Sequence, residues 1–260
     1  MTPEAQALLA SWDTGEQIAP LSDQNPSLND GAAYKIAAEI RDARVARGET
    51  PIGRKIGFTN PDLMAVFGVK DPIWGWMYDT TFNWIADQNT ADLTLIADPR
   101  LEAEIAVKFA RAPRVDMSVH EIADCLEWVA LGYEIVTSAY PDWKFKAPDT
   151  MAAQSMHRAY FCGEPLAWDN LEPKILDNLS VVLSNGDTRL EGSGVKVLGG
   201  PLRAISHLMK VVENHDSPRI EAGEIITTGS LTDVPSIRPG ETWTTEISDI
   251  ALPGITLSLT

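Results

Sequence analysis

The chain has 260 residues, of which 44% are hydrophobic, and it carries a formal charge of −16 at pH 7. This length and composition are typical of a globular protein that buries one large core. The negative charge argues against nucleic acids and anionic membranes as partners, because phosphate groups are bound by clustered Lys and Arg. The N-terminal residues lack the basic and apolar segments of a signal peptide, and no apolar run approaches a membrane span, so we expect a cytoplasmic protein.

The first part of the chain is predicted to be mainly helical. Thr2 is a suitable cap for a helix over residues 5–12, and Asn29 can cap a second helix over residues 31–47. Apolar residues in the second helix recur every three to four positions, as expected of a helix with one buried face. A strand over residues 53–59 and a short helix follow.

From about residue 94 onward the pattern changes to one in which strands dominate. Asn185-Gly186-Asp187 is a strong hairpin signal between two such strands. Helices are expected at residues 118–128, 150–157 and 202–213. Because strands and helices do not alternate regularly, the order argues against a doubly wound parallel sheet and favours an α+β fold.

Three glutamates on two predicted strands suggest a metal site. Successive side chains of a strand point to opposite faces, so Glu102 and Glu104 share one face, about 7 Å apart along the strand. Glu134 lies in a second, apolar strand, where a buried carboxylate is costly unless it is paired, protonated or bound to a cation. Three converging carboxylates suit a hard ion such as Mg²⁺ or Mn²⁺. The alternative is that Glu102 and Glu104 simply form the exposed face of a strand.

Lys55 is the best candidate for a catalytic base, catalytic acid or carboxylate anchor. It lies between Gly53 and Gly57 in an apolar setting that would partly desolvate its ammonium and make it titratable near neutral pH. An exposed lysine on a strand is the alternative, and Arg54 is a weaker candidate for the anchor.

Other patterns in the sequence are weaker. Gly192-Ser193-Gly194 lacks the third glycine and the acidic ribose partner of a dinucleotide-binding loop, and neither Ser193 nor Ser230 lies in a nucleophile elbow. The four histidines show no zinc-binding pattern. The two cysteines, Cys125 and Cys162, are expected to be reduced thiols with packing roles.

Several segments of the chain occur together in a recognisable order. They are Gly53-Arg54-Lys55-Ile56-Gly57-Phe58-Thr59-Asn60, residues 101–105, Glu134-Ile135-Val136, Asp142-Trp143, Asp149-Thr150, residues 194–201 and Thr228-Gly229-Ser230-Leu231-Thr232. In order and spacing they resemble the 2-keto-4-pentenoate hydratase / 4-oxalocrotonate decarboxylase family, within the fumarylacetoacetate hydrolase superfamily. The resemblance implies a mixed β-roll or sandwich core over residues 76–260, with a helical N-terminal region over residues 1–75 packed on it.

The resemblance also implies an active site that binds a small 2-oxo or 2-hydroxy-dienoate, in a protein that forms a homo-oligomer. Mg²⁺ or Mn²⁺ would be bound by Glu102, Glu104 and Glu134. The catalytic residues would be Lys55 and Asp79, with Asp79 as a buried acid beside the lysine. The substrate would contact Thr59, Gln154, Ser193 and Ser230.

The resemblance therefore implies a metal-dependent hydratase that adds water to 2-hydroxy-2,4-dienoates in the degradation of aromatic compounds. The alternatives are a 4-oxalocrotonate-type decarboxylase, a C–C hydrolase or tautomerase of the fumarylacetoacetate hydrolase type, and a non-catalytic partner subunit. One departure concerns the substrate. Hydratases commonly have Asp-Thr-x-Ala-Asp-Asn-x-Ser where this chain has residues 149–156 with Ala153-Gln154 in place of the Asp-Asn pair. We therefore expect a substrate tail larger than that of the simplest pentenoate.

Overall fold

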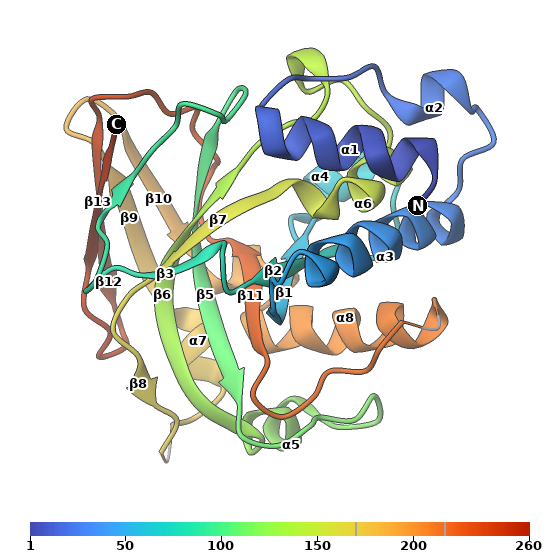
Figure 1. Cartoon of the computed structure of the whole chain (residues 1–260). Coiled ribbons are helices and arrows are strands. Elements are labelled where there is room, and N and C mark those ends of the chain that lie inside the picture. Colours follow the sequence, from blue (N-terminus) through green and yellow to red (C-terminus); the bar gives the residue numbers. More distant parts are fainter. Residues whose placement is uncertain (170, 216) are drawn as a thin grey trace.

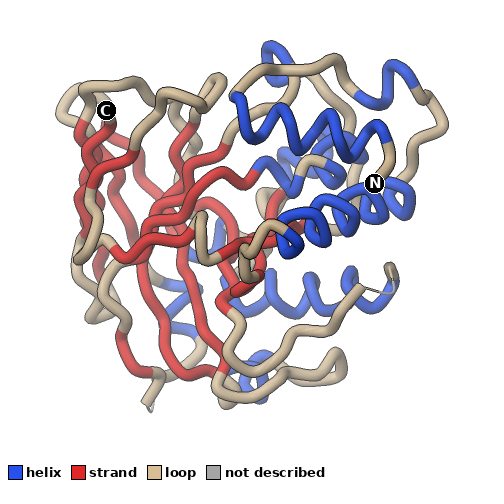
Figure 2. The backbone as a smooth tube through the Cα atoms, viewed as in Figure 1, coloured by secondary structure: helices blue, strands red, loops and turns tan. Residues whose placement is uncertain are grey.

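The computed structural model describes residues 1–169, 171–215 and 217–260, which form two β-sheets and a group of helices. In Figures 1 and 2 the sheets lie at the left and most helices at the right. The N-terminus lies among the helices and the C-terminus beside the strand β13 (Ile255–Leu259). Within the described residues, no helix is long and apolar enough to cross a bilayer.

The N-terminal helices begin where the sequence offers caps. The Thr2 hydroxyl accepts a hydrogen bond from the first turn of α1 (Pro3–Thr14), and Asn29 Oδ1 accepts one from the first turn of α3 (Asp30–Ala46). Two shorter helices, α2 (Leu21–Gln24) and α4 (Pro61–Phe67), complete this part. The helical character predicted for the start of the chain is confirmed.

The large sheet has eight strands in the order β2-β1-β11-β5-β6-β7-β3, with β8 paired to β6. In chain order they are β1 (Pro51–Gly57), β2 (Ile73–Tyr78), β3 (Phe82–Trp84), β5 (Arg100–Phe109), β6 (Leu126–Val136), β7 (His157–Cys162), β8 (Leu166–Ala167) and β11 (Ile225–Ser230). The sheet is mixed, because β1 pairs with β11 and β3 with β7 in parallel, whereas the other pairs are antiparallel. The long strands β5 and β6 curve across the molecule in Figure 1.

The small sheet has five strands in the order β10-β9-β12-β13-β4. The strands not yet located are β4 (Thr90–Ala91), β9 (Ser180–Ser184), β10 (Arg189–Ser193) and β12 (Thr242–Ser248). The predicted hairpin is confirmed: β9 and β10 pair in antiparallel fashion, and Asn185 Oδ1 accepts hydrogen bonds from the N–H groups of Asp187 and Thr188 in the turn.

The later helices are α5 (Val119–Ala123), α6 (Ala147–Ala152), α7 (Lys174–Asn178) and α8 (Pro201–Asn214), with short 3₁₀ turns η1 (Pro141–Trp143), η2 (Gln154–Met156) and η3 (Gly194–Lys196). The helix predicted over residues 118–128 is wrong in its second half. The chain enters β6 at Leu126, and nearly every residue of that strand is buried. A strand covered on both faces reads as a continuous apolar run, which cannot be told from a buried helix by periodicity.

The order of the strands in the large sheet determines which residues lie close together. The predicted α+β class with mixed sheets and a helical N-terminal part is confirmed. The expected boundary between residues 75 and 76 falls inside β2, and β1 belongs to the large sheet, so the N-terminal part and the rest of the chain share one sheet. The central strands β1, β11, β5 and β6 bring Lys55 and the three glutamates to one region.

Candidate active site

Three glutamates from two neighbouring strands converge in the large sheet. Glu102 on β5 lies directly opposite Glu134 on β6, and Glu104 shares the face of Glu102 two residues further on. One carboxylate oxygen from each residue lies within 4.8 Å of the others. Oxygens bound to the same ion at roughly 2.0 to 2.6 Å are separated by no more than about 5 Å, so the spacing fits one cation.

Glu134 is fully buried and held from two sides. Its Oε1 lies 2.7 Å from His157 Nδ1, and its Oε2 lies 3.1 Å from Lys55 Nζ. Burial alone would raise the pKa of Glu134, but the charge of Lys55 and the hydrogen bond from His157 hold it below its usual value. Glu134 is therefore an ionised carboxylate inside the protein.

Glu104 is equally buried but lacks such compensation. Its Oε2 accepts a hydrogen bond from the Gly229 N–H at 2.9 Å, while its Oε1 has no hydrogen-bond partner among the described residues. Burial raises the pKa of Glu104 well above its usual value, and the neighbouring carboxylates raise it further. A buried oxygen without a partner, in a set of carboxylates that repel one another, fits a bound cation. The all-oxygen donor set suits Mg²⁺ or Mn²⁺.

Lys55 is almost completely buried, with 2% of its surface exposed, beside these acids. Burial works against its charge, but the nearby carboxylates raise the pKa of Lys55 above its usual value. The expectation that this lysine titrates near neutral pH is therefore wrong for the chain by itself, because the desolvation that would lower the pKa is outweighed by negative charge.

Arg54 points away, forms an ion pair with Glu224 and stacks on Trp74 and Trp76, so it does not serve as an anchor in the site.

A cavity of about 480 Å³ opens above Lys55 and Glu102. One wall is apolar and largely aromatic, with Phe58 stacked on Phe67 at 4.7 Å and Phe67 on Phe145 at 5.3 Å between ring centroids. Polar groups also line the cavity, among them Thr59, Ser155, Ser230, Arg100 and Lys196. The combination of a charged floor and an apolar wall suits a small acid with an apolar tail.

Two of the expected substrate contacts line this cavity. Thr59 is buried next to Gly229, whose φ of 99° favours glycine and where an added Cβ would lie 2.0 Å from Thr59 Oγ1. Ser230 lines the cavity as well, and its hydroxyl donates a hydrogen bond to the Thr232 carbonyl at 3.0 Å. Glycine at position 229 thus lets Thr59 approach β11 and places both hydroxyls at the cavity wall.

Asp79 does not lie beside Lys55, so its expected position is wrong. It is exposed in the turn after β2, where its Oδ1 accepts a hydrogen bond from the Thr50 N–H at 2.9 Å. Lys55 pairs with Gly75 in the sheet, and the four residues from there to Asp79 span about 13 Å of strand. The apolar segment before Asp79 is a buried strand that ends at the surface.

Gln154 and Ser193 are also placed elsewhere. The Gln154 amide lies between β2 and α3, accepting from the Trp76 N–H at 3.1 Å and donating to the Ala37 carbonyl at 2.8 Å, so both ends bind main-chain groups. Ser193 ends β10 on the small sheet and is bound through its N–H to the Leu231 carbonyl. Neither side chain faces the cavity described above.

Three further residues were not anticipated from the sequence. His157 contacts Glu134 of the glutamate cluster, Ser155 lines the cavity, and the Arg100 guanidinium lies 4.1 Å above the ring of Trp143, which also lines it. In the described part of the chain, Ser155 Oγ and Arg100 Nε are buried without hydrogen-bond partners. Arg100 had a local signal, since it is two residues before Glu102 on the same strand face. His157 and Ser155 had none, because their positions depend on contacts between distant segments.

Comparisons with known proteins identify the relatives of this chain. No protein-family model matches it. A 2-keto-4-pentenoate hydratase from Paraburkholderia xenovorans is 31% identical over 260 residues, which cover 96% of this chain and 94% of the hydratase. The chain belongs to the 2-keto-4-pentenoate hydratase / 4-oxalocrotonate decarboxylase family. A 4-oxalocrotonate decarboxylase from Pseudomonas putida is 31% identical over 227 residues, covering 86% of this chain and 84% of the decarboxylase.

Solved structures confirm the fold of this hydratase/decarboxylase family member. The 4-oxalocrotonate decarboxylase from Pseudomonas putida G7, complexed with magnesium and adipate, superposes with a TM-score of 0.91 at 24% identity, over 99% of this chain and 96% of that one. A protein from Oleispira antarctica, provisionally described as a fumarylacetoacetate isomerase/hydrolase, has a TM-score of 0.60 at 16% identity, over 80% and 94% of the two chains. The resemblance to the family and to the fumarylacetoacetate hydrolase fold is confirmed, and the protein is an enzyme of the hydratase/decarboxylase type.

Proposed function

We propose that the protein is a metal-dependent hydratase that converts 2-hydroxy-2,4-dienoates into 4-hydroxy-2-oxo acids. The observation on which this proposal depends is the convergence of three glutamates and Lys55 beside a cavity that Lys55 and Glu102 line. The hydratase matched at 31% identity spans nearly the whole chain, which supports the same choice.

Glu102, Glu104 and Glu134 would bind Mg²⁺ or Mn²⁺, and the magnesium in the related decarboxylase structure supports this assignment. When bound, the ion supplies Lewis acidity toward the carboxylate and the 2-oxo oxygen of the substrate. Glu102 is the member of the cluster that lines the cavity, so the substrate would approach from its side.

Lys55 would hold a proton at Nζ and donate it to the terminal carbon of the dienol. Its raised pKa favours the ammonium, which suits an acid better than a base. Ser155 lines the same cavity, and its hydroxyl, which has no hydrogen-bond partner among the described residues, would orient the water that attacks C4. The aromatic wall of Phe58, Phe67 and Phe145 would exclude bulk water and contact the tail of the substrate.

The test is an assay with 2-hydroxypenta-2,4-dienoate and with dienols that have longer apolar tails. We expect Mg²⁺-dependent or Mn²⁺-dependent loss of the conjugated ultraviolet absorbance, formation of a 4-hydroxy-2-oxo acid, and higher kcat/KM for the longer tails. The absence of hydration of every dienol in the presence of metal would contradict the proposal.

The 4-oxalocrotonate-type decarboxylase is the second candidate, and one observation favours it. Arg100 presents a guanidinium at the cavity wall whose buried Nε has no partner in the described residues, and a second carboxylate on the substrate could bind there. Release of CO₂ from 2-oxo-3-hexenedioate, together with the absence of dienol hydration, would identify this activity.

We also infer that the protein forms a homo-oligomer, as the resemblance implies. The helix α4 beside the cavity exposes Leu63 and Val66, with 43% and 76% of their surfaces accessible in the single chain. Covering them in an interface would remove apolar surface from water. Light scattering of the purified protein should give a mass that is a multiple of 28.4 kDa.

A further inference from the structure

His157 connects the glutamate cluster to the rest of the protein. Its ring is 2% exposed and lies between two groups, with Nδ1 2.7 Å from Glu134 Oε1 and Nε2 2.9 Å from Thr81 Oγ1. A carboxylate oxygen accepts hydrogen bonds, so the 2.7 Å contact with Glu134 Oε1 places an N–H at Nδ1. On the other side of the ring, Nε2 contacts the Thr81 hydroxyl, whose oxygen also lies 3.1 Å from the Tyr78 carbonyl.

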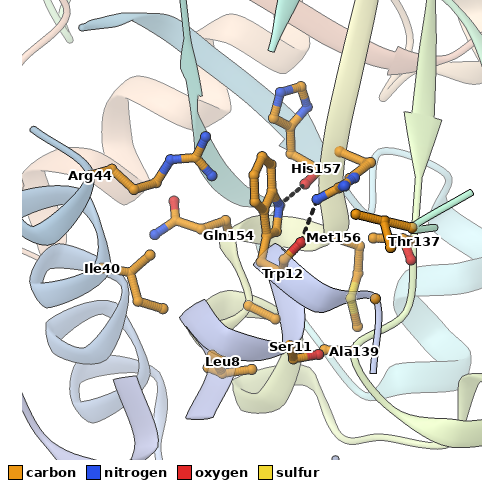
Figure 3. A pocket seen from close by; sticks show the side chains of 14 residues that line it. Leu8, Ser11, Trp12, Ile40, Arg44, Thr137, Ala139, Gln154, Met156 and His157 are labelled. Atoms are coloured by element: carbon orange, nitrogen blue, oxygen red, sulfur yellow. Dashed lines mark hydrogen bonds between the residues drawn. The ribbon is translucent and has the colours of Figure 1, made fainter. Parts of the chain in front are cut away.

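Both ends of His157 are fixed. Thr81 Oγ1 accepts a hydrogen bond from the Tyr78 N–H at 3.0 Å, which ties the ring to the end of β2. The main-chain carbonyl of His157 accepts a hydrogen bond from Trp12 Nε1 at 3.1 Å, as Figure 3 shows. The Trp12 ring is in turn covered by the guanidinium of Arg44 at 3.8 Å. The histidine therefore has little freedom to turn away from Glu134.

We propose that His157 is a positioning residue that makes Glu134 a ligand through one oxygen. The hydrogen bond from Nδ1 occupies Oε1 and leaves Oε2, which lies 3.1 Å from Lys55 Nζ, as the oxygen available to a cation. This inference rests on the metal site of the proposed function. A carboxylate restricted to one oxygen suits Mg²⁺ or Mn²⁺, which require a compact octahedral shell, and disfavours Ca²⁺, which accepts bidentate carboxylates and more oxygens.

The experiment is calorimetric titration of the metal-free full chain with Mn²⁺ and with Ca²⁺. His157→Phe keeps a ring of similar size but removes the donor, and His157→Asn restores an N–H donor near the position of Nδ1. His120→Phe, on the exposed surface of α5, is the matched control. We expect His157→Phe to weaken Mn²⁺ binding by about 10-fold to 100-fold and Ca²⁺ binding by less, whereas His157→Asn recovers most of the loss and His120→Phe changes neither.

The Mn²⁺/Ca²⁺ selectivity separates positioning from a general loss of structure, which would weaken both ions alike. A folded His157→Phe protein that binds Mn²⁺ within about threefold of the wild type, with the same selectivity, would overturn the proposal. So would a folded His157→Asn protein as weak as His157→Phe. If His157→Phe fails to fold, Thr81→Val provides the test, since it removes the group that orients the ring and should lower the selectivity in the same direction. Failure of the wild type to bind Mn²⁺ would instead contradict the metal site itself.

Discussion

At the scale of single residues, the site shows how the same side chain behaves differently with different neighbours. Glu104 and Glu134 are both fully buried carboxyl groups, yet the pKa of Glu104 is raised and that of Glu134 is lowered. Glu134 contacts a lysine and a histidine, whereas Glu104 is bound by a single main-chain N–H. Glu104 is therefore the ligand that depends most on a bound cation.

Replacing Glu104 with Gln should stabilise the metal-free protein and abolish tight metal binding. The amide can still accept from the Gly229 N–H, but it removes a buried negative charge, a gain on the order of 1 kcal/mol for each unit of raised pKa. Urea unfolding in EDTA at pH 7 measures this gain. The difference from the wild type should begin to shrink once the pH falls below the raised pKa of Glu104, and it should disappear near the ordinary pKa of glutamate, where the carboxyl is protonated in both the folded and the unfolded protein. A metal-free variant less stable than the wild type at pH 7 would contradict this account.

Replacing Lys55 with Ala should separate catalysis from metal binding. Loss of the proton donor is expected to lower kcat by about 10² to 10⁴. Mn²⁺ should bind the variant as tightly as the wild type or more tightly, because the ammonium repels a cation at the three glutamates. Steady-state kinetics and calorimetry measure the two effects. Turnover that stays close to the wild-type value would show that Lys55 holds no catalytic proton.

At the scale of elements, the turn η2 stands out because its three residues all have positive φ. Gln154, Ser155 and Met156 have φ values of 55°, 54° and 62°, a left-handed conformation that is unfavourable for residues with a side chain. The Gln154 amide holds the turn in place by binding two main-chain groups, and the turn directs Ser155 into the cavity. The unfavourable left-handed backbone of η2 therefore occurs where the turn places Ser155 in the lining of the cavity.

Two substitutions in this turn should have different effects. Gln154→Ala removes the hydrogen bonds to the Trp76 N–H and the Ala37 carbonyl and should cost about 1–3 kcal/mol of unfolding free energy. Ser155→Ala removes a hydroxyl that has no partner in the described residues, so stability should change little while kcat falls. Thermal unfolding and steady-state kinetics distinguish the two. If Gln154→Ala left the stability unchanged and raised KM, Gln154 would instead be a substrate contact.

At the scale of the whole molecule, a strongly acidic protein is proposed to bind an acidic substrate. Its net charge of −16 would repel such a ligand, and the positive groups near the cavity, Lys55, Arg100 and Lys196, oppose that repulsion locally. A bound divalent cation would add to them. Metal binding is therefore expected to influence both the affinity for the substrate and the stability of the fold.

Metal removal provides the corresponding test. A concentration of Mn²⁺ about 100 times Kd should stabilise the folded protein by about 2.7 kcal/mol, which for a chain of this size raises Tm by roughly 5 to 10 °C. EDTA should reverse this shift and abolish turnover, and added Mn²⁺ should restore both. A Tm that does not respond to Mg²⁺ or Mn²⁺ would argue against the three-glutamate site.

The sequence predicted the parts of the site that depend on local geometry. The two-residue period of a strand places Glu102 and Glu104 on one face, and the order of short segments indicated the family and the fold. Asp79 and Gln154 were misplaced because a segment near the site was assumed to direct its polar side chain into it. The direction depends on where β2 ends and on the left-handed turn at Gln154, neither of which has a local signal. His157 was missed because an isolated histidine shows its partners only when β6 and β7 pair.

The parallel pairing of β1 with β11 has a consequence for how the protein folds. Lys55, near the start of the chain, aligns with Thr227, near its end, and the glutamates lie on strands between them in sequence. The chain must close a very long loop before this pair forms, and such non-local pairings slow folding. A nascent chain still lacking β11 has every predicted metal ligand, but it lacks one of the two strands that flank Lys55 and the Gly229 N–H that binds Glu104. Recovery of Mn²⁺ affinity during refolding should therefore coincide with the slowest phase, after most helical structure has formed.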